Sequence, residues 1–114
     1  MRPSLPPSPD PAHEHLMSPQ ATLVIVRLRA AAGVTMEDMR DVAERVRESF
    51  VGMPGLRRKY FSYSPERREV VNVYVWRDRA AAALVSDPGF VAKIRAVYAG
   101  EPEITVAEVL AIAE

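Results

Sequence analysis

The chain has 114 residues, no cysteine, and fifteen basic side chains that balance fifteen acidic ones. This length suits one domain with a single core, and the balanced charge indicates neither a nucleic-acid groove nor an anionic membrane surface. The lack of cysteine excludes disulfides, thiolate metal sites and a cysteine nucleophile. No apolar run approaches the roughly 18 residues that span a bilayer, so we expect a cytoplasmic protein without membrane or nucleic-acid partners.

The chain changes character near residue 20. Residues 1–19 contain six of the ten prolines and no periodic apolar face. Because proline removes backbone donors and favours extended neighbours, we expect residues 1–20 to form a flexible arm and residues 21–114 the folded domain. His13 and His15 lie in this arm without the further fixed ligands that a metal needs, so no metal site is predicted.

The first predicted strand and helix follow directly. Residues 22–29 (TLVIVRLR) are rich in β-branched side chains, which favours a strand. Thr35 and Asp38 have the spacing of a capping box, so a helix is predicted to start there. Apolar residues then recur at spacings of three and four and form one buried stripe, namely Met36, Met39, Ala43, Val46 and Phe50. Gly52 and the Met-Pro-Gly turn at 53–55 should end this helix.

The next two strands are predicted to pair as a hairpin. Residues 56–63 (LRRKYFSY) and 70–76 (VVNVYVW) flank a turn at 64–67. Alternate side chains in a strand share one face, so Asn72, Tyr74 and Trp76 form a polar and aromatic row opposite three valines. The sequence leaves the hairpin register open, so either Tyr60 or Phe61 can share the face of Asn72.

The last third of the domain reads as two helices and a strand. Asp78 is a candidate cap for a short helix through Val85, and Asp87-Pro88 for a longer one. The longer helix presents a stripe of apolar side chains, Phe90, Ile94, Val97 and Tyr98. Residues 104–112 (ITVAEVLAI) are predicted to be the final strand.

This order of elements is that of an α+β ferredoxin-like domain, β-α-β-β-α-β, with a four-stranded antiparallel sheet. Both helices then cover one face of the sheet. The other face carries many aliphatic side chains, and each is worth roughly 1.5–3 kcal/mol when buried. We therefore expect a homodimer in which two sheets pack face to face and close a barrel.

Two segments resemble a known group of proteins. Residues 50–61 (FVGMPGLRRKYF) and 73–76 (VYVW) are similar to the dimeric α/β-barrel superfamily, which includes antibiotic biosynthesis monooxygenases, and especially to its YdhR-like branch. That branch usually has a glycine pair where this chain has Val71 and Asn72. Asn72 and Trp76 instead match the asparagine and tryptophan spacing of the cofactor-independent anthrone oxygenases of the same superfamily.

The resemblance implies oxidation of an aromatic, polyketide-type substrate by molecular oxygen without a tightly bound cofactor. Asn72 would stabilise the enolate oxygen, and Trp76 would donate to a peroxy intermediate or stack on the substrate. Tyr74 lies between them, and Tyr60, Phe61, Phe90 and Tyr98 are candidates to line the pocket. Each aromatic residue, Trp76 included, also has a purely structural interpretation as a core side chain. The lack of histidine beyond residue 20 speaks against haem.

Several alternatives remain open at this stage. The same pocket would serve a polyketide cyclase or isomerase, or a non-catalytic protein that binds a small hydrophobic ligand. Transient use of reduced flavin is also open, and so are the natural substrate and the general base. The cationic side chains of the hairpin, Arg57, Arg58 and Lys59, together with Arg27, are interpreted as solvated charges at the rim.

Overall fold

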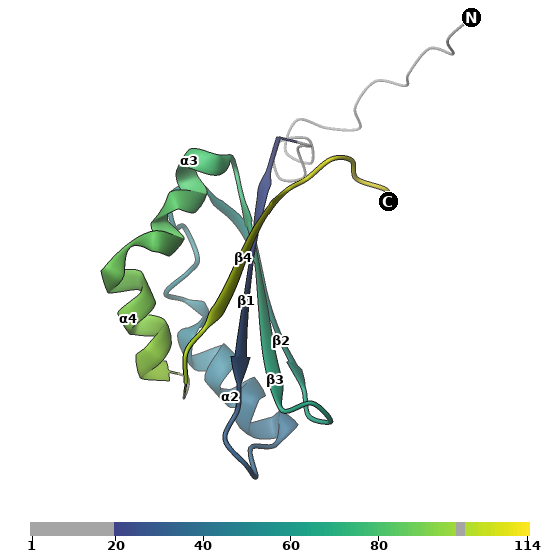
Figure 1. Cartoon of the computed structure of the whole chain (residues 1–114), viewed down its shortest axis with the longest axis vertical. Helices are drawn as coiled ribbons and strands as arrows, with labels where there is room; N and C mark the ends of the chain where they lie inside the picture. The colour runs from purple at the N-terminus through teal and green to yellow at the C-terminus, as the bar shows by residue number, and fades with distance from the viewer. Residues whose placement is uncertain (1–19, 98–99) are drawn as a thin grey trace, which may run out of the picture.

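A computed structural model describes residues 20–97 and 100–114 of the chain (Figure 1). One antiparallel sheet has the strand order β2-β3-β1-β4, formed by β1 (Thr22–Arg29), β2 (Leu56–Ser64), β3 (Glu69–Trp76) and β4 (Glu103–Glu108). The helices lie together on one side of this sheet: α2 (Met36–Arg47), α3 (Arg79–Ala82) with the 3-10 turn η1 (Ala83–Ser86), and α4 (Pro88–Val97). The predicted α+β ferredoxin-like fold is confirmed. Residues 1–19 of the predicted arm, which was expected to span residues 1–20, lie outside the described residues.

The predicted capping box starts α2. The Thr35 hydroxyl accepts a hydrogen bond from the Asp38 backbone N–H at 3.1 Å, and the Asp38 carboxylate accepts one from the Thr35 N–H at 2.9 Å. These two bonds satisfy backbone donors that the first helical turn leaves open. The helix ends at Arg47, so Phe50 sits in the turn that follows rather than on the helix, and it still packs against the core.

The caps of the later helices are also as predicted. Asp78 accepts a hydrogen bond from the Ala81 N–H at 2.8 Å at the start of α3. Backbone bonding and the contact with Arg77 lower the pKa of Asp78. Asp87 accepts from the Gly89 N–H at 2.7 Å, directly before α4. An ionised side chain at these positions complements the positive end of each helix.

The final strand is shorter than predicted. β4 ends at Glu108, whereas the sequence pattern suggested Ile112. Its partner strand β1 begins at Thr22, which pairs with Glu108, and one further bond joins Val109 N–H to the Ala21 carbonyl. Among the described residues, β1 pairs with β4 no further than this point. Apolar alternation alone therefore overestimated the length of the strand, because a strand extends only as far as the neighbouring strand with which it pairs.

A β-bulge interrupts β2 between Leu56 and Arg58. Leu56 lies opposite Trp76, and Lys59 lies opposite Tyr74, so the two face the same side although three residues separate them. The extra residue, Arg57, accounts for this break in alternation. The bulge thus turns Leu56 toward the helices, while residues 58–64 alternate regularly.

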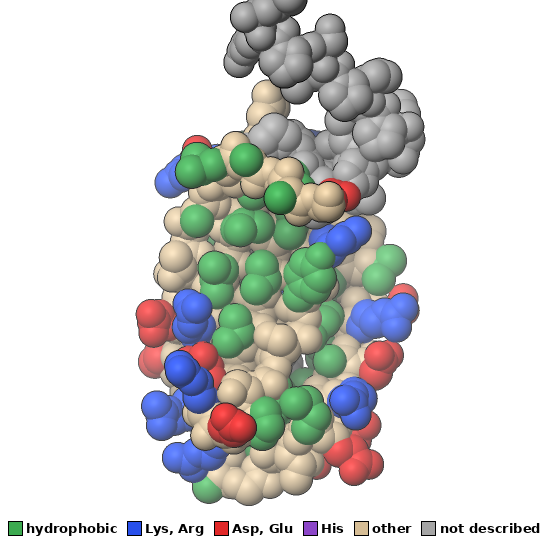
Figure 2. All heavy atoms as spheres, turned by 90° about the vertical axis from the view of Figure 1, so that its right-hand side faces the viewer, with side chains coloured by type: hydrophobic (Ala, Val, Ile, Leu, Met, Phe, Trp, Pro, Cys, Tyr) green, Lys and Arg blue, Asp and Glu red, His purple; other side chains and the backbone are tan. Residues whose placement is uncertain are grey.

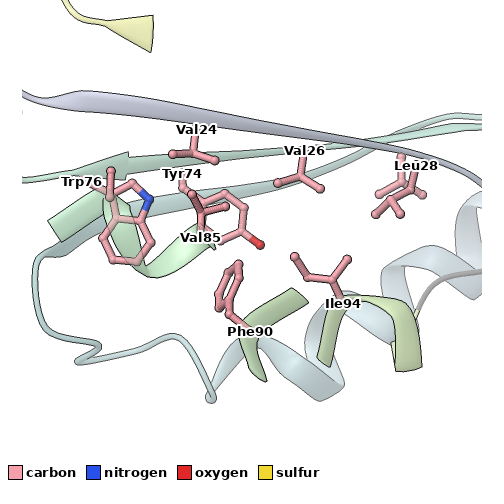
Figure 3. Packing of buried hydrophobic residues seen from close by; sticks show 10 residues of the cluster. Val24, Val26, Leu28, Tyr74, Trp76, Val85, Phe90 and Ile94 are labelled. Atoms are coloured by element: carbon pink, nitrogen blue, oxygen red, sulfur yellow. The ribbon is translucent and has the colours of Figure 1, made fainter. Parts of the chain in front are cut away.

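The hydrophobic core fills the space between the sheet and the helices. Figure 3 shows side chains of β1 and β3 meeting those of η1 and α4, among them Val24, Val26, Leu28, Tyr74, Trp76, Val85, Phe90 and Ile94. Tyr74 stacks on Trp76 with ring centroids 6.2 Å apart and contacts Phe90 edge to face at 5.9 Å. This packing makes β3 the centre of the core.

The opposite face of the sheet is not covered by a helix. Figure 2 shows hydrophobic side chains along its middle, with charged side chains at both sides. The strand register places a connected apolar set on it, formed by Leu23, Ile25, Val71, Val73, Val75, Ala107 and the ring of Tyr60. We call this set the open sheet face.

Candidate functional site

The row predicted on β3 lies on the helix-facing side of the sheet. Asn72, Tyr74 and Trp76 pair with Val26, Val24 and Thr22 of β1, and all three are at most 1% exposed. A buried asparagine is uncommon because its amide loses hydration that only hydrogen bonds restore. Asn72 is one of two buried polar side chains among the described residues, and the other is Thr22.

Asn72 lies at the floor of a groove of about 510 Å³ between α2 and strands β2 and β3. We call it the α2 groove. Its apolar wall on the helix is formed by Met36, Met39 and Ala43, and its wall on the sheet by side chains that include Phe61, Tyr63 and Val70. The volume falls in the range of about 300–1,000 Å³ that is usual for small-molecule sites.

Tyr74 lines a second, more apolar hollow of about 290 Å³ beneath α4. We call it the α4 hollow. It is lined mainly by apolar side chains, including Val46, Phe50, Met53, Phe90 and Ile94. Only Lys59 lines both the α2 groove and the α4 hollow. The two spaces are therefore adjacent, and this lysine is the wall between them.

Lys59 was interpreted from the sequence as a rim charge, and the structure corrects this. Its ammonium nitrogen lies 3.4 Å from the ring centroid of Phe50, 4.2 Å from that of Phe61 and 4.5 Å from that of Tyr74. Burial lowers the pKa of Lys59 from 10.5 to about 7. The sequence signal was its place two residues before Phe61, because alternate strand positions share a face.

Trp76 belongs to the core. Its side chain has no exposed surface and lines neither the α2 groove nor the α4 hollow. Gly55 packs on its ring edge, and an added methyl there would lie 3.9 Å from the Trp76 Cε3 atom. Within the described part of the chain, the indole N–H has no hydrogen-bond acceptor. The predicted catalytic pair is thus split, because Asn72 lines the α2 groove and Trp76 lies in the core. Figure 3 shows Trp76 beside Tyr74 in that core.

The other predicted pocket residues divide between three places. Phe61 pairs with Asn72 and lines the α2 groove, and Phe90 lines the α4 hollow. Tyr60 pairs with Val73, is 47% exposed, and lies on the open sheet face, where Arg58 donates to its hydroxyl at 3.0 Å. The register turns the Tyr60 ring to the other face of the sheet from Asn72, although Tyr60 also contributes to the lining of the α2 groove. Tyr98 lies outside the described residues.

Among residues 20–97 and 100–114, no group of three or more His, Asp or Glu side chains is placed to hold a metal ion. His13 and His15 lie outside the described residues. None of the helices in the described part has the length and apolar character needed to cross a membrane.

No protein-family profile matches the sequence, and no curated protein matches it. Solved structures do match in three dimensions. The monooxygenase from the gene ActVA-Orf6 of Streptomyces coelicolor, in complex with nanaomycin D, has a TM-score of 0.62 at 18% identity, over 79% of this chain and 88% of that chain. SnoaB, a cofactor-independent oxygenase from Streptomyces nogalater solved as an asparagine-to-alanine mutant, has a TM-score of 0.57 at 18% identity, over 77% and 91%.

A third match is a protein from Chloroflexus aurantiacus that is provisionally described as an antibiotic biosynthesis monooxygenase. Its TM-score is 0.57 at 18% identity, over 82% of this chain and 97% of that chain. At such identities the likeness concerns the fold, and it agrees with the resemblance seen in the sequence. The chain therefore has the ferredoxin-like fold of the antibiotic biosynthesis monooxygenase-like proteins.

Proposed function

We propose that the chain is a small homodimeric oxygenase that oxidises an aromatic, polyketide-type phenol or anthrone with molecular oxygen and without a tightly bound cofactor. The observation that carries this proposal is the amide of Asn72, buried at the floor of the α2 groove beside aromatic and thioether side chains. Two structural neighbours support it, because one is a monooxygenase with a bound ligand and the other a cofactor-independent oxygenase.

The proposed reaction needs no electrons from the protein. Removal of a proton from the anthrone CH₂ group gives an electron-rich enolate, which reduces oxygen, and the CH₂ becomes C=O while one water is released. The protein has to hold a flat ring, stabilise the enolate oxygen and exclude water. Asn72 supplies an amide N–H for the oxyanion. The rings of Phe61 and Tyr63 and the thioethers of α2 supply apolar surface for the substrate.

Trp76 has a supporting role in the proposed site. Its indole N–H has no acceptor among the described residues, and its ring stacks on Tyr74. Because the indole is buried and lines neither the α2 groove nor the α4 hollow, its role in the proposed site is to hold Tyr74 in place from the core. Replacement by phenylalanine retains an aromatic ring for this contact.

The open sheet face supports the homodimer. Its apolar centre and charged sides (Figure 2) are the arrangement expected where a second copy packs its own sheet. Two such sheets would close a barrel and leave the α2 groove of each copy on the outside. Light scattering at micromolar concentration should give twice the chain mass, and replacement of Ile25 by lysine in the middle of the face should give a monomer. A monomeric wild-type protein would refute the dimer.

The first functional experiment is oxygen uptake by metal-stripped protein with a panel of anthrones and hydroxylated naphthalenes, with and without reduced flavin. Uptake without flavin above the uncatalysed rate is the expected result. Asn72→Ala should reduce it by about 10²–10³-fold, the usual effect of losing an oxyanion donor. Ser86→Ala, an exposed position far along the chain from the groove residues, is the control and should keep full activity.

Other results would redirect the assignment. Uptake only with reduced flavin would move the protein to flavin-dependent chemistry. Conversion of the substrate without oxygen would favour a cyclase or an isomerase, and a retained ligand without conversion would favour a binding protein. Full activity of Asn72→Ala would remove the proposed role of this residue.

A further inference from the structure

Lys59 stands in an unusual place for a lysine. It lies in the middle of β2 and faces the helices, and the faces of three rings, those of Phe50, Phe61 and Tyr74, lie within 4.5 Å of its nitrogen. These rings come from the turn after α2, from β2 and from β3. The amine is therefore enclosed by side chains from three parts of the fold, whereas a solvated lysine extends into water.

The sheet register places this amine close to Asn72. Lys59 pairs with Tyr74, and Asn72 pairs with Phe61, so Lys59 and Asn72 are diagonal neighbours on adjacent strands of the same face. Long side chains at such positions reach one another. Both residues also line the α2 groove. A ligand in that groove would therefore meet an amide donor and an amine together.

The charged groups around Lys59 do not neutralise it. Those that line the α2 groove or the α4 hollow are Arg40, Glu44 and Arg47 on α2 and Lys93 on α4. Arg57 and Arg58 on β2 line a third hollow, which Lys59 also borders. The one carboxylate, Glu44, is exposed and pairs with Arg47 at 3.4 Å. Among the described residues no carboxylate forms an ion pair with Lys59.

These surroundings destabilise the ammonium form of Lys59. Burial without a counter-ion disfavours the charge. Burial lowers the pKa of Lys59 to about 7. The ring faces act the other way, because they attract a cation. An amine in this cage can therefore gain a proton during a reaction and hold the resulting ammonium ion on the rings.

We propose that Lys59 is the proton acceptor of this site, for an aromatic ketone or phenol whose oxygen is held by Asn72. The C–H or O–H bond of the ligand breaks, its electron pair stays on the ligand as an enolate or phenolate, and the proton forms the third N–H bond of the ammonium. No electron leaves the ligand in this step, so it needs neither oxygen nor a cofactor. The inference takes its ligand class from the proposed function and adds the base that the oxygenase needs.

The other groups of the groove fit this role less well. Tyr63 donates its hydroxyl hydrogen to the Val34 carbonyl at 3.0 Å, and Glu44 is engaged by Arg47. A guanidinium group does not serve as a proton acceptor at ordinary pH. Lys59 is the group that combines a lowered pKa with a half-buried position beside Asn72.

The protonation state can be measured directly, because the chain has two lysines. In protein labelled with ¹³C and ¹⁵N lysine, NMR follows both ε-amines against pH, and Lys59→Met assigns the signals. The exposed Lys93 is the internal reference. The midpoint of Lys59 should lie at least two pH units below that of Lys93. A Lys59 midpoint within one unit of Lys93 would overturn the proposal.

The proton transfer itself can be measured without oxygen. Under anaerobic conditions in D₂O, the wild-type protein should accelerate deuterium exchange at the CH₂ group of anthrone, detected by mass spectrometry. Lys59→Met and Lys59→Arg should each lose about 10²-fold of this acceleration, which is typical of a missing general base. Lys59→Arg keeps the stem and the charge, so it serves where the methionine variant unfolds.

The outcomes separate this inference from the oxygenase. Exchange that depends on Lys59 but no oxygen uptake would support the base and refute the oxygenase. Oxygen uptake with no accelerated exchange, or exchange that is unchanged in folded Lys59→Met and Lys59→Arg, would refute the base. Exchange in wild type that follows the titration of Lys59, rising as the amine loses its proton, is the full expected result.

Discussion

Replacing Lys59 by methionine should stabilise the protein near neutral pH, and the gain should disappear in alkali. The folded state holds the ammonium poorly, since burial lowers the Lys59 pKa from 10.5 to about 7. Below pH 7 both the folded and the unfolded chain carry this proton. The unfavourable free energy of burying the ammonium ion then destabilises the folded state in full. Between pH 7 and 10.5 the unfolded chain binds more protons, so the stability of the wild type rises with pH.

The size of the effect follows from the same shift. Lowering the pKa from 10.5 to about 7 corresponds to about 5 kcal/mol. This is an upper bound, because the contacts with three rings favour the ammonium by about 0.5–2 kcal/mol each. With ring contacts at the weak end of this range, we expect the stability difference between Lys59→Met and the wild type to fall by about 2 kcal/mol from pH 6 to pH 9.5.

The assay is urea unfolding at several pH values, followed by fluorescence of the single tryptophan, Trp76, at one fixed protein concentration. Other groups titrate equally in both proteins, so the difference isolates Lys59. Lys93→Met is the matched control, since Lys93 is exposed, and its difference from the wild type should not depend on pH. A pH-independent difference for Lys59→Met would refute a buried amine of low pKa.

Three further predictions concern the packing around the site. Trp76→Ala should destabilise the fold by about 3–5 kcal/mol, because the ring is fully buried, and Trp76→Phe should destabilise it clearly less. Urea unfolding followed by circular dichroism measures both. Equal losses of stability would contradict the packing described. Gly55→Ala should lower the melting temperature strongly, since the new methyl would lie 2.5 Å from the Ala81 Cβ atom at a φ of +80°. Gly52→Ala has a similar φ of +77° but open space around it, so it measures the backbone strain alone and should be the milder change. Equal melting temperatures for the two glycine variants would argue against the close contact of Gly55 with α3.

Local rules predicted most of the elements. Thr35, Asp78 and Asp87 mark helix starts because each side chain bonds to backbone a few residues away, so their information is local. The β1 and β3 strands followed from dense β-branched residues. The end of β4 was wrong, because it depends on where β1 begins, a partner distant in the sequence.

The site was only partly predictable. The shared face of Asn72, Tyr74 and Trp76 follows from alternation within one strand. The position of Lys59 does not, because it depends on the hairpin register, which the sequence pattern does not reveal. The same register places Tyr60 on the open sheet face. Burial of an amine among rings from three elements is a property of the assembled fold.

The short turn between β2 and β3 has a large effect on chemistry. Residues 65–68 fix the register of the hairpin, and Arg68 adopts a left-handed φ of 51° there. Because side chains alternate, a turn longer or shorter by one residue would invert β2 along the paired stretch. Lys59 and Phe61 would then point toward the open sheet face, and Arg58 and Tyr60 toward the helices. Related chains can therefore gain or lose this amine through a one-residue insertion or deletion in a surface turn, while the lysine itself stays unchanged.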